Sequence, residues 1–252
     1  MTSLCIKLNR MKPDKDPMGR AIADYHATGK AARLRVFSPM FDEDEIPVTT
    51  LFRTLDEMPA IEREALQVAD GAILDVGAGA GCHSLALQAM EKHVTAIDIS
   101  PLAVETMRER GVKDVREQDF FTLDGKFDTI LMLMNGIGIV GTLNRLPAFF
   151  MQVDHLLAPG GQLLCDSSDL CYLYEDEDGI IDLTGVEGYY GELTYQMQYK
   201  DIKGESFPWL FIDPETLRDY ANAHGFNCDI LMRGPHYDYL ARLTRHTTSS
   251  CH

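Results

Sequence analysis

The stretch AILDVGAGAGCHSLAL, residues 72–87, decides the fold of this chain. Its first five residues are mostly apolar and are typical of a buried strand in a parallel sheet. Three alternating glycines follow, Gly77, Gly79 and Gly81, and after them a run that favours a helix. Glycines let the backbone turn sharply and approach a ligand at points where a Cβ would collide. The pattern predicts a nucleotide-like ligand above the end of this strand.

The spacing of the glycines separates two classes of ligand. A dinucleotide-binding loop places its third glycine three residues after the second, whereas Gly79 and Gly81 are two residues apart. The loop also lacks the Gly-Lys-Ser/Thr ending of a P-loop. Asp75 stands just before the glycines, where a carboxylate would repel a pyrophosphate and attract an ammonium group. The loop therefore favours a cofactor with a cationic amino-acid portion.

Strands and helices alternate after residue 70, which is typical of a parallel sheet covered on both faces. The expected strands are residues 72–76, 93–98, a segment around Val115, 127–134 and 162–169, with helices between most of them. Closer to the C-terminus, residues 192–200, 226–232 and 237–243 have the pattern of strands, and residues 213–225 that of a helix. The sequence predicts a doubly wound α/β fold.

At the glycine loop the sequence resembles the class I S-adenosylmethionine-dependent methyltransferases, whose first motif reads acid-x-Gly-x-Gly-x-Gly. The resemblance implies a Rossmann-like fold with seven mostly parallel strands, in which residues 192–243 would supply the antiparallel one. It also implies S-adenosyl-L-methionine as cofactor and methyl transfer to a small molecule by in-line displacement. The implied cofactor-binding residues are Asp75, Gly77, Ala78, Gly79, Gly81, Asp98, Ile99, Asp119, Phe120 and Asn135.

Acidic residues stand at the carboxyl ends of two successive expected strands: Asp98 ends one, and Asp119 follows the next. This is the edge of an open α/β sheet where ligands bind. Asp98 is placed to accept both ribose hydroxyl hydrogens, a two-point contact for an ionised carboxylate; the alternative is an exposed acid that caps a helix. Asp119 and Phe120 resemble the family's adenine pair, against the alternative of a loop acid and a core ring. Asn135 is expected near the methionine end of the cofactor.

The first 70 residues are expected to be mainly helical. Helices are predicted at residues 17–29, 48–56 and 60–69, and the acidic stretch FDEDEIP, residues 41–47, is expected to be a charged loop. We therefore predict two parts: residues 1–70 as an N-terminal helical cap or lid, and residues 71–252 as the cofactor-binding core. Gly19, Tyr25 and residues 35–37 are the expected inner surface of the lid. The same segment is also the candidate interface of a homodimer.

Methyl transfer from a sulfonium depends mainly on placing the acceptor in line, so few catalytic residues are needed. A hydroxyl, an acidic carbon or a protonated amine also needs a general base. The catalytic residue is not assigned by the sequence, and the candidates are Tyr25, His26, Asp166, Asp169 and His236. Aromatic residues near the C-terminal strands would build either an apolar acceptor wall or part of the core: Tyr190, Tyr195, Phe207, Trp209, Tyr237 and Tyr239.

Composition excludes several partners. The formal net charge of −16 argues against nucleic acid, whose binding needs clustered lysine and arginine. The six cysteines are scattered without zinc-type spacing, so reduced thiols and no metal are expected. With neither a signal-peptide pattern nor a long apolar run, the chain is expected to be cytoplasmic and without a membrane partner. Two other functions stay open: a non-catalytic cofactor-binding sensor or scaffold, and an NAD(P)-dependent oxidoreductase.

Overall fold

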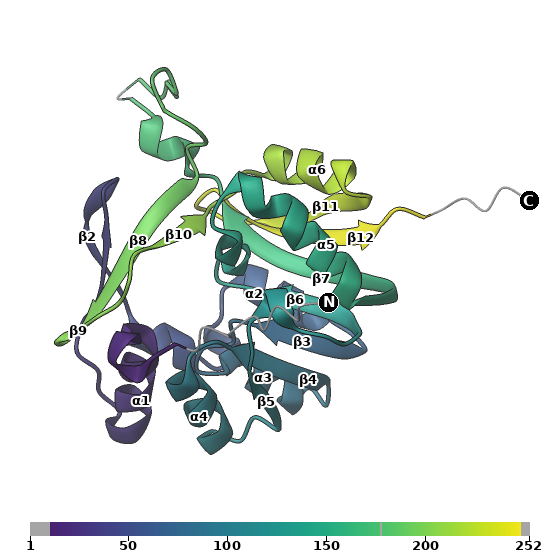
Figure 1. Cartoon of the computed structure of the whole chain (residues 1–252). Coiled ribbons are helices and arrows are strands. Elements are labelled where there is room, and N and C mark those ends of the chain that lie inside the picture. Colours follow the sequence, from purple (N-terminus) through teal and green to yellow (C-terminus); the bar gives the residue numbers. More distant parts are fainter. Residues whose placement is uncertain (1–10, 177, 248–252) are drawn as a thin grey trace, which may run out of the picture.

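A seven-stranded sheet forms the centre of the computed structural model, which describes residues 11–176 and 178–247 (Figure 1). The strand order is β11-β12-β7-β6-β3-β4-β5. All neighbours pair in parallel except β12, which is antiparallel to both β7 and β11. The predicted doubly wound, mostly parallel fold is confirmed. The strands are β3 (Ala72–Val76), β4 (His93–Asp98), β5 (Asp114–Glu117), β6 (Phe127–Met132), β7 (Leu157–Ser168), β11 (Phe226–Arg233) and β12 (Asp238–Arg245).

Helices cover both faces of this sheet because its central strands are apolar on both sides. On β3, Leu74 and Val76 pack with residues of α5 and α6, whereas Ile73 packs with residues of α2 and α3. Helix α4 packs on the same face as α3, through Val104 and Met107. The helices are α1 (Pro17–Thr28), α2 (Ala60–Val68), α3 (Cys82–Ala89), α4 (Pro101–Glu109), α5 (Leu146–Leu156) and α6 (Pro214–Ala223).

Short 3-10 helices fill several of the connections. One predicted helix, residues 48–56, is instead two such turns, η2 and η3, because the chain is extended at Arg53 and Thr54 and a capping box between Thr54 and Glu57 starts the second turn. The 3-10 helices are η1 (Pro13–Lys15), η2 (Val48–Phe52), η3 (Leu55–Glu57), η4 (Phe120–Thr122), η5 (Gly136–Val140), η6 (Leu143–Arg145) and η7 (Leu170–Tyr174).

A second sheet stands beside the first and joins distant parts of the chain (Figure 1). It has the order β10-β8-β1-β2, with β9 also paired to β8, and its pairs are antiparallel. Its strands are β1 (Leu34–Ser38), β2 (Phe41–Ile46), β8 (Glu192–Tyr199), β9 (Ile202–Lys203) and β10 (Phe207–Leu210).

This sheet corrects two expectations. The acidic stretch FDEDEIP is not a loop, because its first six residues are strand β2, so the first 70 residues hold a β-hairpin as well as helices. Four successive exposed acidic residues hide the alternation by which a strand is recognised. In the structure, Arg35 of β1 forms an ion pair with Glu43, and Arg33, just before β1, forms one with Glu45. Strand β8 joins this sheet, so β11 and β12 alone complete the main one.

The N-terminal helix is fixed to the core by two helix caps that bind each other. Asp16 accepts a hydrogen bond from the Gly19 N–H at the start of α1 (2.8 Å), and Ser100 accepts one from the Ala103 N–H at the start of α4 (3.0 Å). The Ser100 hydroxyl also donates to Asp16 (2.5 Å), and both residues are buried. One buried serine therefore holds α1 against α4.

We expect Ser100→Ala to lower the free energy of unfolding by about 2 kcal/mol, because it removes an N-cap and leaves the buried Asp16 carboxyl without its hydroxyl donor. Urea denaturation measures this change. Thr49→Ala, at an exposed position, is the control. Equal stability of the two variants would contradict the cap-to-cap link.

Candidate functional site

The glycine loop lies between β3 and α3 and is held by strand β4. Gly77, Gly79 and Gly81 all have positive φ, at 67°, 55° and 81°. The N–H groups of Gly77 and Ala78 both donate to the Ile97 carbonyl of β4 (3.0 and 3.1 Å). This contact fixes the loop at the carboxyl edge of the sheet.

Gly77 and Gly81 differ in what a side chain would meet at their positions. A Cβ at Gly77 would meet no atom within 4 Å, so this side of the loop is open. A Cβ at Gly81 would lie 3.0 Å from side-chain atoms of both Met107 and Val112, because α3 packs closely on that neighbouring segment. Gly77 therefore leaves space beside the loop, whereas Gly81 serves the packing of the helix.

Asp98 ends β4 beside the loop. Its carboxylate accepts from the Gly79 N–H (2.9 Å) and from the Ser100 N–H (2.8 Å), and the side chain stays partly exposed. Burial raises the pKa of Asp98 to about 6; the two N–H donors oppose this shift, and the charges of Asp16 and Asp75 add to it. The next residue, Ile99, is 50% exposed.

Asp75 lies beneath the loop rather than facing the open side. It is 2% exposed and accepts a hydrogen bond from the Ser84 hydroxyl in the first turn of α3 (2.6 Å). Burial raises its pKa, and the nearby His83 and the Ser84 hydrogen bonds oppose that shift. Any attraction of Asp75 for an ammonium group would therefore act through charge at a distance rather than through a direct hydrogen bond.

The predicted adenine pair divides into a loop acid and a core ring. Asp119 caps η4 by accepting from the Phe121 N–H (2.8 Å) and remains partly exposed. Phe120 is only 3% exposed, and its ring packs against Phe121 and Phe149 at centroid distances of 5.3 and 5.8 Å. The ring therefore belongs to the core. A contact with adenine stays a prediction for Asp119 and Phe120, and a contact with the cofactor stays a prediction for the exposed Ile99.

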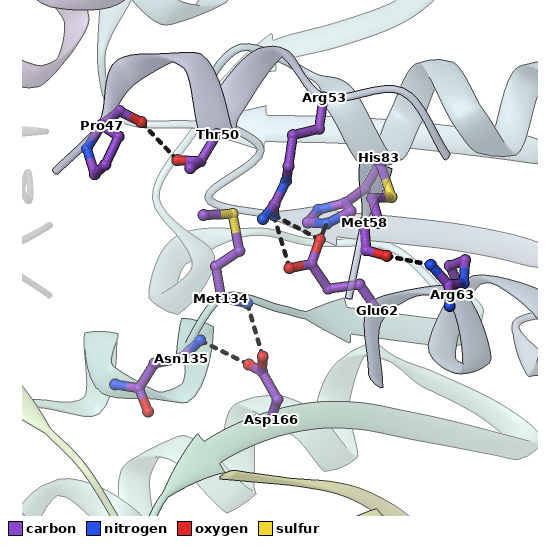
Figure 2. A network of polar contacts seen from close by, with 10 residues as sticks. All are labelled: Pro47, Thr50, Arg53, Met58, Glu62, Arg63, His83, Met134, Asn135 and Asp166. Atoms are coloured by element: carbon purple, nitrogen blue, oxygen red, sulfur yellow. Dashed lines mark hydrogen bonds and ion pairs between the residues drawn. The ribbon is translucent and has the colours of Figure 1, made fainter. Parts of the chain in front are cut away.

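The loop after β6 is held by a carboxylate from β7 (Figure 2). Met134 and Asn135 both have positive φ, at 59° and 57°, which is unusual for residues other than glycine. Their N–H groups donate to the two oxygens of Asp166 (3.1 and 2.7 Å), while the Asn135 side chain accepts from Ser167 (2.8 Å). Burial raises the pKa of Asp166 to about 7 against the Asn135 N–H, and the charge of Glu62 adds to the shift. Asp166 therefore holds this backbone in place.

A buried ionic network lies above Asp166, as Figure 2 shows. Arg53 donates to both oxygens of Glu62 (2.7 and 2.8 Å), and Glu62 also contacts the His83 ring (2.8 Å). Burial alone would lower the pKa of His83, but Glu62, Asp75 and Asp166 together raise it above its ordinary value. Among the described residues, the Arg53 Nε is one of three buried side-chain polar atoms without a hydrogen-bond partner.

The remaining base candidates have other surroundings. The Tyr25 ring packs against Phe52 at 4.7 Å, and His26 pairs with Glu109 (3.3 Å) at the end of α4 remote from Asp98. Asp169 accepts from the hydroxyl of Tyr190 (2.8 Å). His236 is exposed in the turn between β11 and β12. The structure groups Asp75, Asp98, Asn135 and Asp166 around the carboxyl edge, but it does not bring the five base candidates together.

The aromatic residues near the C-terminal strands divide between the core and the second sheet. Tyr239 is fully buried and donates to the Ile212 carbonyl (2.6 Å), so it belongs to the core. Tyr195, Phe207 and Trp209 lie on the second sheet, where all three stay partly exposed. On β1, Val36 is buried, whereas Arg35 and Phe37 stack on each other on the opposite face of the strand. Of the expected inner-surface residues 35–37, only Val36 is therefore buried.

Acidic side chains dominate the edge where these elements meet: Asp16, Glu62, Asp75, Asp98 and Asp166, against Arg53 and His83. This charge suits a cationic ligand. No cluster of potential metal ligands occurs among residues 11–176 and 178–247. In the same part of the chain, no helix is long and apolar enough to cross a bilayer.

Sequence reasoning missed Asp16, Arg53 and Glu62. The dipeptide Asp16-Pro17 has the same form as Ser100-Pro101 and Asp213-Pro214, which also cap helices in the structure, so a systematic search of the sequence for caps would have found it. Arg53 and Glu62 carry no such signal, because their partner His83 comes from a distant segment.

Comparisons with known proteins agree with this geometry. A family model described as a methyltransferase domain matches residues 73–161. The crystal structure of a SAM-dependent methyltransferase from Bacteroides fragilis, in complex with S-adenosyl-L-homocysteine, is 57% identical, with a TM-score of 0.88 over 94% of this chain and 97% of that one. Among curated proteins, none matches this chain significantly.

Two more distant structures share the fold alone. The DhpI-SAM-HEP complex is 20% identical, with a TM-score of 0.60 over 90% of this chain and 94% of that one. The CcbJ methyltransferase from Streptomyces caelestis is 13% identical, with a TM-score of 0.59 over 92% and 98%. The predicted resemblance and its methyl donor, S-adenosylmethionine, are confirmed by the 57% identical protein. On that identity, which extends over nearly the whole length of both proteins, the chain belongs to the S-adenosylmethionine-dependent methyltransferases.

Proposed function

We propose that this protein transfers a methyl group from S-adenosylmethionine to a small-molecule acceptor at the carboxyl edge of the main sheet. The observation that carries the proposal is the open side of Gly77 next to Asp98, a partly exposed carboxylate on the adjacent strand. Gly77 leaves room for a ligand to lie against the backbone, and Asp98 offers the paired acceptor that a ribose requires. The residues present therefore fit this cofactor.

The other residues would hold the remaining parts of the cofactor. Ile99, half exposed, would cover the adenine, and the Asp119 carboxylate would accept from its amino group. Asn135 would lie at the methionine end, on the backbone that Asp166 holds. When bound, the cofactor supplies an activated methyl group on a sulfonium. The protein's own task is to place the acceptor in line with that methyl and to exclude water.

Residues 1–70 would act as the lid of this site, and residues 71–252 as the core. Helix α1 packs on α4, and the Asp16–Ser100 contact brings it close to Asp98. A lid there would keep bulk water from the methyl group. A homodimer through this segment and a cytoplasmic location stay predictions. The oxidoreductase alternative loses support, because the glycine spacing and the 57% identical methyltransferase both point elsewhere.

Calorimetry should detect binding of S-adenosylmethionine and of S-adenosylhomocysteine but no heat with NADH. A panel of small acceptors should then yield S-adenosylhomocysteine with at least one of them, as measured by mass spectrometry. Tight NADH binding without S-adenosylmethionine binding would overturn the proposal. Cofactor binding with no turnover across a broad panel would instead favour the non-catalytic sensor.

Asp98→Asn should weaken S-adenosylhomocysteine binding by about tenfold or more, because an amide cannot accept both ribose hydroxyl hydrogens. Titration calorimetry provides the dissociation constant. The control is Glu105→Gln, at an exposed position on α4. An unchanged affinity in Asp98→Asn would remove Asp98 from the cofactor site.

The affinity should also depend on pH through Asp98. Its raised pKa of about 6 means that the carboxylate is ionised above that pH and protonated below it. The affinity is therefore present at neutral pH and is lost as the pH falls, by about tenfold per pH unit below the pKa. Calorimetry between about pH 5 and pH 8 tests this, and Asp98→Asn should flatten the profile. An equally steep profile in that variant would assign the dependence to another group.

A further inference from the structure

Five aromatic rings form a continuous wall on the second sheet. Each ring contacts the next edge-on: Phe41 with Tyr195 at 5.8 Å, Tyr195 with Phe207 at 6.2 Å and with Phe211 at 6.3 Å, and Phe207 with Trp209 at 6.0 Å. All five are only partly buried, and none belongs to the hydrophobic clusters of the core. We call these five residues the aromatic wall. Rings that fill no core and stay open are typical of a binding surface.

The sheet that carries the wall has two different faces. Strand pairing places Leu34 opposite Tyr199 and Val36 opposite Met197, and Phe207 opposite Tyr195, so these residues share one face. The other face is polar and carries the ion pairs of Arg33 with Glu45 and Arg35 with Glu43. The described residues of the first face include no lysine or arginine; they are Leu34, Val36, Asp44, Ile46, Leu193, Tyr195, Met197, Tyr199, Ile202, Phe207 and Trp209.

The face that carries the wall meets the elements of the cofactor site at two ends. At one end, a Cβ on Gly138 would lie 2.2 Å from the Trp209 indole, so this ring sits directly on η5, the turn that follows Asn135. At the other end, Tyr199 packs in a cluster with Ala21 of α1, and α1 is bound to α4 next to Asp98. The face therefore spans from the ribose side to the methionine side of the cofactor site.

One exposed acid, Asp44, accompanies the wall. It lies on edge strand β2, opposite Val36. Val36 in turn pairs with Met197, two residues from Tyr195 on the same face, so Asp44 and Tyr195 lie diagonally across this face. Burial, with the charge of Asp44 as the next cause, raises the pKa of Tyr195 to about 12. The negative faces of aromatic rings and a carboxylate both attract a cation. An anionic acceptor would meet repulsion, because the face provides no basic residue.

We propose that the aromatic wall is the acceptor site and that the acceptor is a small amine with a flat or apolar body, drawn in as an ammonium ion by Asp44 and the ring faces. This inference rests on the proposed methyl transfer and names its substrate class. The body would pack on Tyr195, Phe207 and Trp209. The amine would bind as an ammonium ion on the Asp44 side of the wall and reach the methyl group, expected near Asn135, after it has lost its proton.

The chemical step balances without any further reactant. The ammonium first loses one proton to water, which frees the nitrogen lone pair. That pair forms the new N–C bond as the C–S bond breaks, and the electrons of the C–S bond return to sulfur. The products are S-adenosylhomocysteine and an N-methylated ammonium ion, which carries the positive charge that the sulfonium has lost.

Trp209 makes a direct test possible, because it is the only tryptophan of the chain. Its fluorescence reports on the wall itself and does not require turnover. We would titrate the full-length protein, with and without S-adenosylhomocysteine, with three compounds of one body and different charge: phenethylamine, phenethyl alcohol and phenylacetate. The amine should bind about tenfold more tightly than the alcohol, and phenylacetate should bind most weakly.

Two pairs of variants separate the acid from the rings. Asp44→Asn should abolish most of the preference for the amine, whereas Glu45→Gln, on the opposite face of the same strand, should keep it. Tyr195→Leu should weaken the binding of all three compounds. Phe37→Leu, at the ring that contacts Arg35 on the other face, should leave their binding unchanged. Circular dichroism and thermal midpoints would show that each variant is folded.

The outcomes distinguish this inference from the proposed function. Tighter binding of phenylacetate than of the amine, or no change in Trp209 fluorescence with any of the three compounds, overturns the amine site. Equal losses in Asp44→Asn and Glu45→Gln overturn the role of Asp44. If S-adenosylhomocysteine still binds by calorimetry in those cases, methyl transfer stands and only the acceptor assignment fails. If S-adenosylhomocysteine does not bind by calorimetry, the proposed function itself fails.

Discussion

The site depends on a pair of backbone hydrogen bonds, in which the Ile97 carbonyl accepts from two successive N–H groups of the glycine loop. This contact ties the loop after β3 to the end of β4, and Asp98 completes it by accepting from Gly79. Because the two strands are parallel, the open side of Gly77 and the Asp98 carboxylate both lie at the carboxyl edge of the sheet. The proposed position of the ligand rests on this parallel pairing.

Charge is the second feature that unites the site. The raised pKa values of Asp16, Asp98 and Asp166 share one main cause, burial, and neighbouring acids add to it at Asp98 and Asp166. Ionising these buried carboxyl groups costs free energy when no ligand is bound, and a bound cation lowers that cost. A sulfonium with an ammonium group supplies that cation, and its demethylated product supplies less positive charge. The same electrostatics would favour binding of the donor and release of the product.

The second sheet brings the proposed acceptor site beside the proposed cofactor site. It joins β1 and β2 from the N-terminal region to β8 and β10 from beyond the main parallel strands, and it carries the aromatic wall on one face. We expect the acceptor to be chosen where the second sheet meets η5, because Trp209 packs there against Gly138.

The sequence by itself determined the main sheet, the glycine loop and the family, because these depend on local signals: apolar runs, helix caps, and glycines where the backbone takes positive φ. It could not place β2, whose four exposed acids hide any alternation. Nor could it find the network of Arg53, Glu62 and His83 or the inner face of the second sheet. Those were decided only by tertiary structure, because they arise from pairing between distant segments, as when the Ala32 N–H donates to Tyr199, 167 residues away.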